Sequence, residues 1–254
     1  MHTLIYDGSF EGLLSAVFYT YEYKLTNVHI YRSEAPPALF GNTVVVESDL
    51  AKAERVWKGL AKLLSSEGLN TIYSSYLADT LQEENNILAY MRYAFSAGKN
   101  IEADYSNFAV LRAQQVARMV SRERHRMKAF VRFMLTKDGI YYAHIEPDFN
   151  VLPLIKSHFE NRYADQRWII YDHKRNYGLY YNLDKTETIT LQFNQTGSGM
   201  AINFDENEEA YQNLWRQYFK SVNIPDRKNM KLHIQHVPRR YWHLLSEKNT
   251  GALN

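Results

Sequence analysis

The chain has 254 residues, 45% of them hydrophobic and 23% charged, with a formal net charge of +2. These values are ordinary for a globular protein and exclude an intrinsically disordered chain. The absence of cysteine excludes disulfides, thiol nucleophiles and iron–sulfur clusters held by this chain. The nine histidines show no recognised ligand spacing, so we expect no metal and no other cofactor.

The N-terminus lacks the basic start and long apolar run of a secretory signal. No stretch of the sequence approaches the roughly 18 apolar residues that would span a bilayer. We therefore expect a cytoplasmic protein with no membrane contact.

The small net charge hides an uneven distribution. Residues 112–132 contain seven basic side chains against one acidic side chain, a local charge of +6. Residues 216–240 repeat that balance, with seven basic side chains against one acidic. Two basic regions on an acidic body favour an anionic partner.

The first half of the chain predicts strand and helix units. His2–Tyr6 is a short predicted strand, Asp7-Gly8-Ser9 is a turn, and Phe10–Tyr21 has apolar residues at helical spacing. Two further strands are predicted at Val28–Tyr31 and Val44–Glu47. Three helices are predicted after them, at Leu50–Leu64, Asp79–Phe95 and Tyr105–Lys128.

The pattern then changes to mainly strand. Phe130–Leu135 and Ile140–Ile145 flank Asp138-Gly139, a strong hairpin signal. A helix over Val151–Tyr163 is followed by predicted antiparallel strands at Trp168–Asp172, Tyr177–Leu183 and Glu187–Phe193. The last predicted helix starts at Asp205, with Glu208 at capping-box spacing, and ends before Pro225. Its apolar stripe consists of Tyr211, Leu214, Trp215, Tyr218 and Val222.

These elements predict an α/β fold that is α+β in its C-terminal half. Strand–helix units and helices come first, followed by an antiparallel sheet with packed helices. We place an N-terminal α/β segment at residues 1–84, an α+β domain at 85–247 and a frayed tail at 248–254.

Two pairs of side chains are candidates for acid–base chemistry. Asp7 and Glu11 flank a strand-to-helix turn, where both carboxylates and the helix amides could serve a site. The alternative is that Asp7 or Ser9 caps the helix. His144 and Glu146 share one face of a predicted strand, so they form either an acid–base pair or a structural hydrogen-bonded pair at the sheet rim.

Two groups of side chains are candidates for nucleic-acid binding. Arg118, Arg122 and Arg126 recur at helical spacing, so one helix face could meet phosphates or could simply be solvated. The second group, Arg239-Arg240-Tyr241-Trp242, interleaves cations and aromatic rings as single-strand binders do, although such aromatics serve equally in a core.

Five segments carry a resemblance to a known family: Tyr6–Leu14, Arg126–Phe133, Tyr142–Pro147, His158–Asp172 and Gln235–Trp242. Together they resemble a bacterial family described as probable DNA metabolism proteins, a DNA repair family of unknown function, over nearly the whole chain. It implies a role in DNA modification or repair beside a radical S-adenosylmethionine protein. In some relatives a uracil-DNA glycosylase domain follows, but this sequence ends at Asn254, so we expect no glycosylase activity.

The leading hypothesis is a nucleic-acid-binding accessory protein that presents DNA to a radical S-adenosylmethionine partner. Two alternatives remain open. One is a metal-independent enzyme acting on a nucleic-acid base or nucleotide. The other is a protein-interaction scaffold without nucleic-acid contact, whose basic segments bind an acidic protein.

Overall fold

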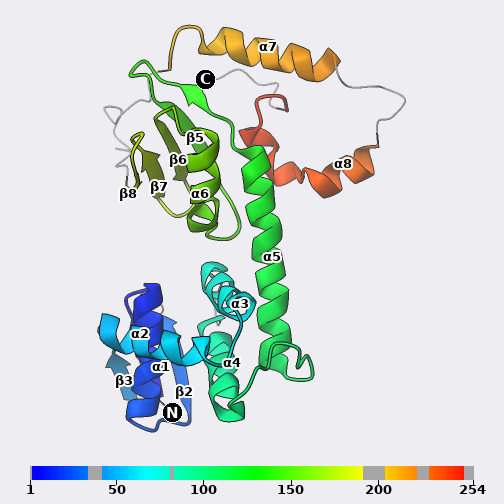
Figure 1. Cartoon of the computed structure of the whole chain (residues 1–254). Helices are drawn as coiled ribbons and strands as arrows, with labels where there is room; N and C mark the ends of the chain where they lie inside the picture. Colours follow the sequence, from blue (N-terminus) through cyan, green and yellow to red (C-terminus); the bar gives the residue numbers. More distant parts are fainter. Residues whose placement is uncertain (1, 34–41, 81–82, 191–203, 222–228, 249–254) are drawn as a thin grey trace. The chain divides into compact units, whose positions relative to one another are not determined.

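The computed structural model describes residues 2–33, 42–80, 83–190, 204–221 and 229–248 (Figure 1). The chain divides into two compact units, Met1–Ser121 and Arg122–Asn254. The division falls inside helix α5 (Phe108–Phe130), which therefore begins in the first unit and ends in the second. None of the described helices is long and apolar enough to cross a membrane.

The first unit is built on a three-stranded parallel sheet. Strand β1 (His2–Tyr6) lies in the middle, between β2 (Val28–Arg32) and β3 (Asn42–Val45). Leu4 and Tyr6 on one face of β1 are fully buried and Thr3 on the other face is 1% exposed, as expected of a parallel strand that is covered on both faces.

Helices α1 (Phe10–Glu22), α2 (Leu50–Ala61), α3 (Ser66–Leu77) and α4 (Glu83–Ala97) pack around this sheet. Helix α3 is an addition to the predicted elements. It begins after Ser65, whose hydroxyl accepts hydrogen bonds from the first amides of the helix.

The unit boundary differs from the one expected at residue 84. Ile87, Leu88 and Met91 of α4 and Val110 of α5 are buried in the same core as β1. Burial of these apolar side chains holds α4 and the start of α5 in the first unit.

The second unit contains a five-stranded sheet in the order β4-β5-β6-β7-β8. The strands are β4 (Met134–Leu135), β5 (Tyr141–Ile145), β6 (Trp168–Asp172), β7 (Tyr177–Tyr181) and β8 (Thr186–Ile189). The predicted hairpin joins β4 to β5, and Gly139 in its turn has a φ of +70°. Residues 191–193 of the last predicted strand lie outside the described residues.

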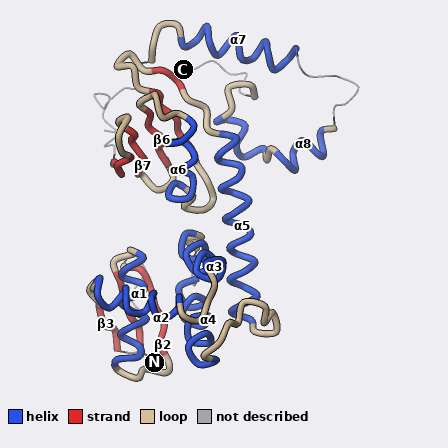
Figure 2. The backbone as a smooth tube through the Cα atoms, viewed as in Figure 1, coloured by secondary structure: helices blue, strands red, loops and turns tan. Residues whose placement is uncertain are grey.

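One pairing in this sheet differs from the antiparallel expectation. Strands β5 and β6 are parallel, because α6 (Leu152–Arg162) carries the chain back across the sheet between them. Helix α6 packs against β7, as Figure 2 illustrates. The sheet is therefore mixed, and the α/β class with an α+β second half is confirmed in this form.

The second unit also contains α7 (Glu208–Ser221), α8 (Met230–His236) and the 3₁₀ helix η2 (Arg239–Leu244). Helix α5 runs to Phe130, so the strand expected from that residue is reduced to Met134–Leu135. The predicted stripe residue Val222 and the predicted helix end at Pro225 lie outside the described residues.

Candidate functional site

A cavity of about 1070 Å³ lies in the second unit, between the last turns of α5, strands β4 and β5, and helices α6 and α7. Its lining is rich in cations, histidines and aromatic rings. The lining cations are Lys128, Arg132, Arg162 and Arg216, the lining histidines are His125, His144, His158 and His243, and Glu208 is the lining carboxylate. A large concave site with convergent polar groups is the usual form of a ligand site.

Backbone contacts at the short edge strand β4 hold α7 over this cavity. Leu135 N donates to the Glu208 carboxylate at 2.9 Å, and Asp205 N donates to Leu135 O at 2.9 Å. The capping box expected from Asp205 and Glu208 is therefore not formed as predicted, because Glu208 bonds to the edge strand. Asp205 accepts instead from Asn207 N at 2.9 Å. The Glu208 side chain thus holds α7 against the edge strand β4.

Three of the lining cations, Lys128, Arg162 and Arg216, make no ion pair with a carboxylate in the described part of the chain. The Arg162 guanidinium lies 5.7 Å from the ring centroid of Tyr163. Burial and the positive charges of Lys128 and Arg162 lower the pKa of His158. These groups therefore form a region of positive potential, which suits an anion.

Arg132 is the lining cation that is neutralised. It makes an ion pair with Glu247 at 2.7 Å, and its guanidinium lies 5.9 Å from the ring of Trp215. Trp215 Nε1 donates to the same carboxylate at 3.0 Å. Burial alone would raise the pKa of Glu247, but hydrogen bonds from Arg132 and Trp215 lower it. The indole ring of Trp215 on α7 is thus fixed in orientation.

The predicted pair of His144 and Glu146 is not formed as expected. Glu146 pairs with His243, whose Nε2 lies 3.2 Å from the carboxylate. His144 lies beside His173, with ring centroids 5.4 Å apart. Burial, followed by the neighbouring His173 and His243, lowers the pKa of His144 although Glu146 opposes the shift. A neutral imidazole at the cavity wall can accept a proton or a hydrogen bond.

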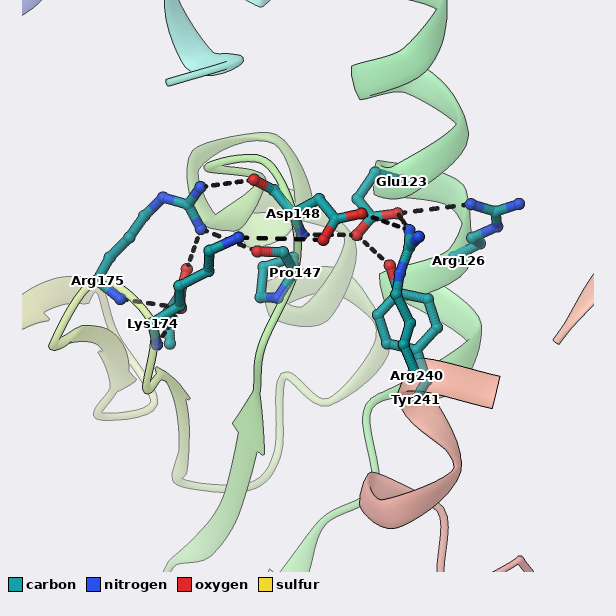
Figure 3. A network of polar contacts seen from close by, with 9 residues as sticks. Glu123, Arg126, Pro147, Asp148, Lys174, Arg175, Arg240 and Tyr241 are labelled. Carbon is teal, nitrogen blue, oxygen red and sulfur yellow. Dashed lines mark hydrogen bonds and ion pairs between the residues drawn. The ribbon is translucent and has the colours of Figure 1, made fainter. Parts of the chain in front are cut away.

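The 239–242 segment is largely structural. The Tyr241 side chain is 1% exposed and donates to buried Glu123, which also accepts from Asp148 N at 2.9 Å and from Arg240 at 3.2 Å (Figure 3). Arg240 makes a second ion pair with Asp148 at 2.8 Å. Burial removes the ring of Tyr241 from the surface, so this structure does not favour the predicted stacking of Tyr241 on bases.

The flanking residues of that segment are more accessible. The Arg239 guanidinium lies 5.8 Å from the ring of Trp242, and Trp242 Nε1 donates to Val237 O at 3.0 Å. Both belong to η2, whereas the cavity is lined from this region by His243 and Ser246. Arg239 and Trp242 thus remain predicted binding residues outside the cavity lining.

The arginines predicted along α5 have separate environments. Arg118 and Arg122 are exposed, whereas Arg126 is half-buried and lies 3.7 Å from the Glu123 carboxylate. Their use in binding stays a prediction. The cavity instead takes His125 and Lys128 from this helix.

Asp7 organises a turn in the first unit. Its carboxylate accepts from Ser9 N at 3.0 Å, from Ser9 Oγ at 2.6 Å and from Ser48 Oγ at 2.7 Å. The hydrogen bonds from Ser9, followed by that from Ser48, lower the pKa of Asp7. Ser9 caps α1 by accepting from Gly12 N at 2.9 Å, and no hydrogen bond joins Asp7 to Glu11 in the residues described. These contacts correspond to the capping alternative.

No group of three or more histidine or carboxylate side chains in the described ranges is placed to hold a metal ion. The sequence did not predict that one cavity is lined by Lys128, Phe133, Arg162 and ring side chains of α7. The signal was present in part, since Lys128 lies in the first basic segment and α7 carries tyrosine and tryptophan at helical spacing.

Comparison with known proteins finds a matching family and similarity to a solved structure. No curated protein matches the sequence. The fold is similar to a solved structure of the pGpG-specific phosphodiesterase PggH from Vibrio cholerae, at a TM-score of 0.37 and 9% identity, over 88% of this chain and 100% of that one. A family described as a domain of unknown function, DUF4130, matches residues 81–247. Because these residues make up more than half of the sequence, the chain belongs to the DUF4130 family.

Proposed function

We propose that this protein binds nucleic acid at the cavity of its second unit, as an accessory protein in a DNA modification or repair reaction. The observation that carries the proposal is the group Lys128, Arg162 and Arg216, three lining cations without a carboxylate partner in the described residues. In nucleic-acid sites such cations bind the phosphates, and neighbouring aromatic rings stack on the bases.

The sequence resemblance and the lack of cysteine support the accessory role. A radical S-adenosylmethionine partner needs an iron–sulfur cluster, which is held by thiolates that this chain does not have. The two proteins would divide the work, with this chain holding the strand and the partner supplying the electron.

The binding test compares two double variants of equal charge. K128Q/R162Q removes two cavity cations, and K156Q/K185Q removes two surface lysines that pair with Glu160 and Glu187. Binding of a labelled oligonucleotide is measured by fluorescence anisotropy over a series of salt concentrations. We expect the wild type to lose affinity steeply with salt, and K128Q/R162Q to reduce the slope of log K against log salt by about 0.7 for each lost contact with a single strand.

The control variant K156Q/K185Q should keep the wild-type slope. Equal slopes for all three proteins would refute the cavity as the binding site. Failure of the wild type to bind at low salt would refute nucleic-acid binding and leave the scaffold alternative, to be tested with an acidic protein ligand.

A second candidate function is a metal-independent enzyme acting on a base or nucleotide, favoured by the lowered pKa of His144 at the cavity wall. The two functions are separated by assaying the purified chain on damaged and undamaged DNA, with and without the anaerobically reconstituted partner. We expect turnover only with the partner. Turnover by this chain alone would favour the enzyme, and H144A would then be the first variant to assay.

A further inference from the structure

Helix α7 exposes the stripe that its sequence predicts to be a packing face. Tyr211, Trp215 and Tyr218 are 60%, 40% and 57% exposed. Large aromatic side chains grouped on one exposed helix face mark a binding surface more often than a solvated one. We call these three side chains the α7 ridge.

The ridge has a regular geometry. Its members are spaced by four and three residues, so they lie on one face of the helix. The rings of Trp215 and Tyr218 are stacked, with centroids 5.7 Å apart and planes inclined by 30°. The hydrogen bond from Trp215 Nε1 to Glu247 fixes the central ring. The ridge is therefore partly ordered before any ligand arrives.

The ridge is continuous with the cavity. Tyr211 and Trp215 belong to the cavity lining, as do Lys128, Arg162 and Arg216, for which the described residues supply no carboxylate partner. Phosphates carry negative charge and bases carry flat π faces, so a nucleic-acid strand is complementary to both parts of this surface. An apolar protein segment would leave those three cations without a counterion.

We propose that the α7 ridge stacks the unpaired bases of a single-stranded nucleic acid whose phosphates lie at Lys128 and Arg162. This inference rests on the proposed function and makes it more specific. In a duplex the base faces are covered by the neighbouring base pairs, so the ridge has no face to stack on. The protein therefore distinguishes single strands from duplexes without reading sequence.

The test is the double variant Y211L/Y218L, which removes two exposed rings but keeps apolar side chains. Y23L is the matched control, because Tyr23 is also 57% exposed and lies in the first unit. Dissociation constants are measured for one oligonucleotide, single-stranded and paired with its complement, at one low salt concentration. Thermal melting confirms that both variants are folded.

We expect the wild type to prefer the single strand, and Y211L/Y218L to lose affinity for it by about fivefold or more for each ring, the low end for base–aromatic stacking. Y23L should bind as the wild type does. Equal affinity of the wild type for single strand and duplex would overturn the inference.

The outcomes also separate this inference from the proposed function. If K128Q/R162Q weakens single-strand binding and Y211L/Y218L does not, the cavity binds nucleic acid but the ridge does not stack bases. That result would overturn the inference alone. Absence of binding by the wild type would overturn both.

Discussion

Replacing Tyr241 with phenylalanine tests whether this residue is structural or binds bases. The hydroxyl donates to buried Glu123, which keeps its hydrogen bonds from Asp148 N and Arg240 after the change. Phenylalanine also keeps the ring contact with Phe130, whose centroid is 5.5 Å away, so no cavity forms. The loss is therefore one hydrogen bond to a charged group, and we expect the free energy of unfolding to fall by about 1.5–3 kcal/mol.

The assay is urea unfolding followed by tryptophan fluorescence. Trp168, Trp215 and Trp242 all lie in the second unit, so the signal reports mainly on the unit that contains Tyr241. The control is Y23F, for which we expect a change within about 0.5 kcal/mol, as for other surface substitutions. Y241F should also bind oligonucleotides as the wild type does. A change in stability as small as that of Y23F, or a loss of affinity without a loss of stability, would refute the structural assignment.

Two further predictions concern other packed polar groups. In G12A the added Cβ would lie 2.7 Å from Ser48 Oγ and closer still to Asp7 Oδ1, so we expect a loss of about 1–3 kcal/mol on thermal melting, and an unchanged melting temperature would contradict the tight packing. The pKa of Glu247 is lowered below its ordinary value of 4.5, so its stabilising effect is complete above that pH and is lost as the pH falls below it. E247Q should therefore be less stable than the wild type at neutral pH by about 1–3 kcal/mol, and a gap that does not close on acidification below that value would contradict this reasoning.

Local signals in the sequence predict much of the fold. The strand His2–Tyr6 and the following helix are found because an apolar strand, a glycine turn and a helical period occur in direct succession. The β4–β5 hairpin is found because Asp138-Gly139 supplies a residue that adopts positive φ. Each of these elements depends on contacts between residues close in the sequence.

The direction of β6 was harder to predict from the pattern of apolar residues alone. An alternating or apolar run identifies a strand but not its orientation in the sheet. The sequence predicts a helix over Val151–Tyr163, close to the observed α6, and a strand–helix–strand connection within one sheet usually returns the chain parallel. The connection rule, applied to the predicted elements, would have given the observed pairing.

The stripe on α7 shows a second limit of pattern reasoning. Its period predicts a helix correctly, and α7 begins at Glu208. The period does not distinguish a face that packs on a core from a face that awaits a partner, since both need apolar side chains. The exposed Tyr211 and Tyr218 could be recognised only once the surrounding elements were placed.

Whether a cation can bind an anionic ligand depends on carboxylates that are distant in the sequence. Arg132 and Arg240 contribute to the two basic segments, yet Glu247 neutralises the first across 115 residues and Glu123 contacts the second across 117. A local count of charge cannot include such partners, because they meet only in the folded chain. Lys128, Arg162 and Arg216 have no carboxylate partner among the described residues and line the cavity next to α7, whereas the exposed Arg118 and Arg122 lie outside its lining. Binding should therefore respond to K128Q/R162Q far more than to equal changes of charge elsewhere.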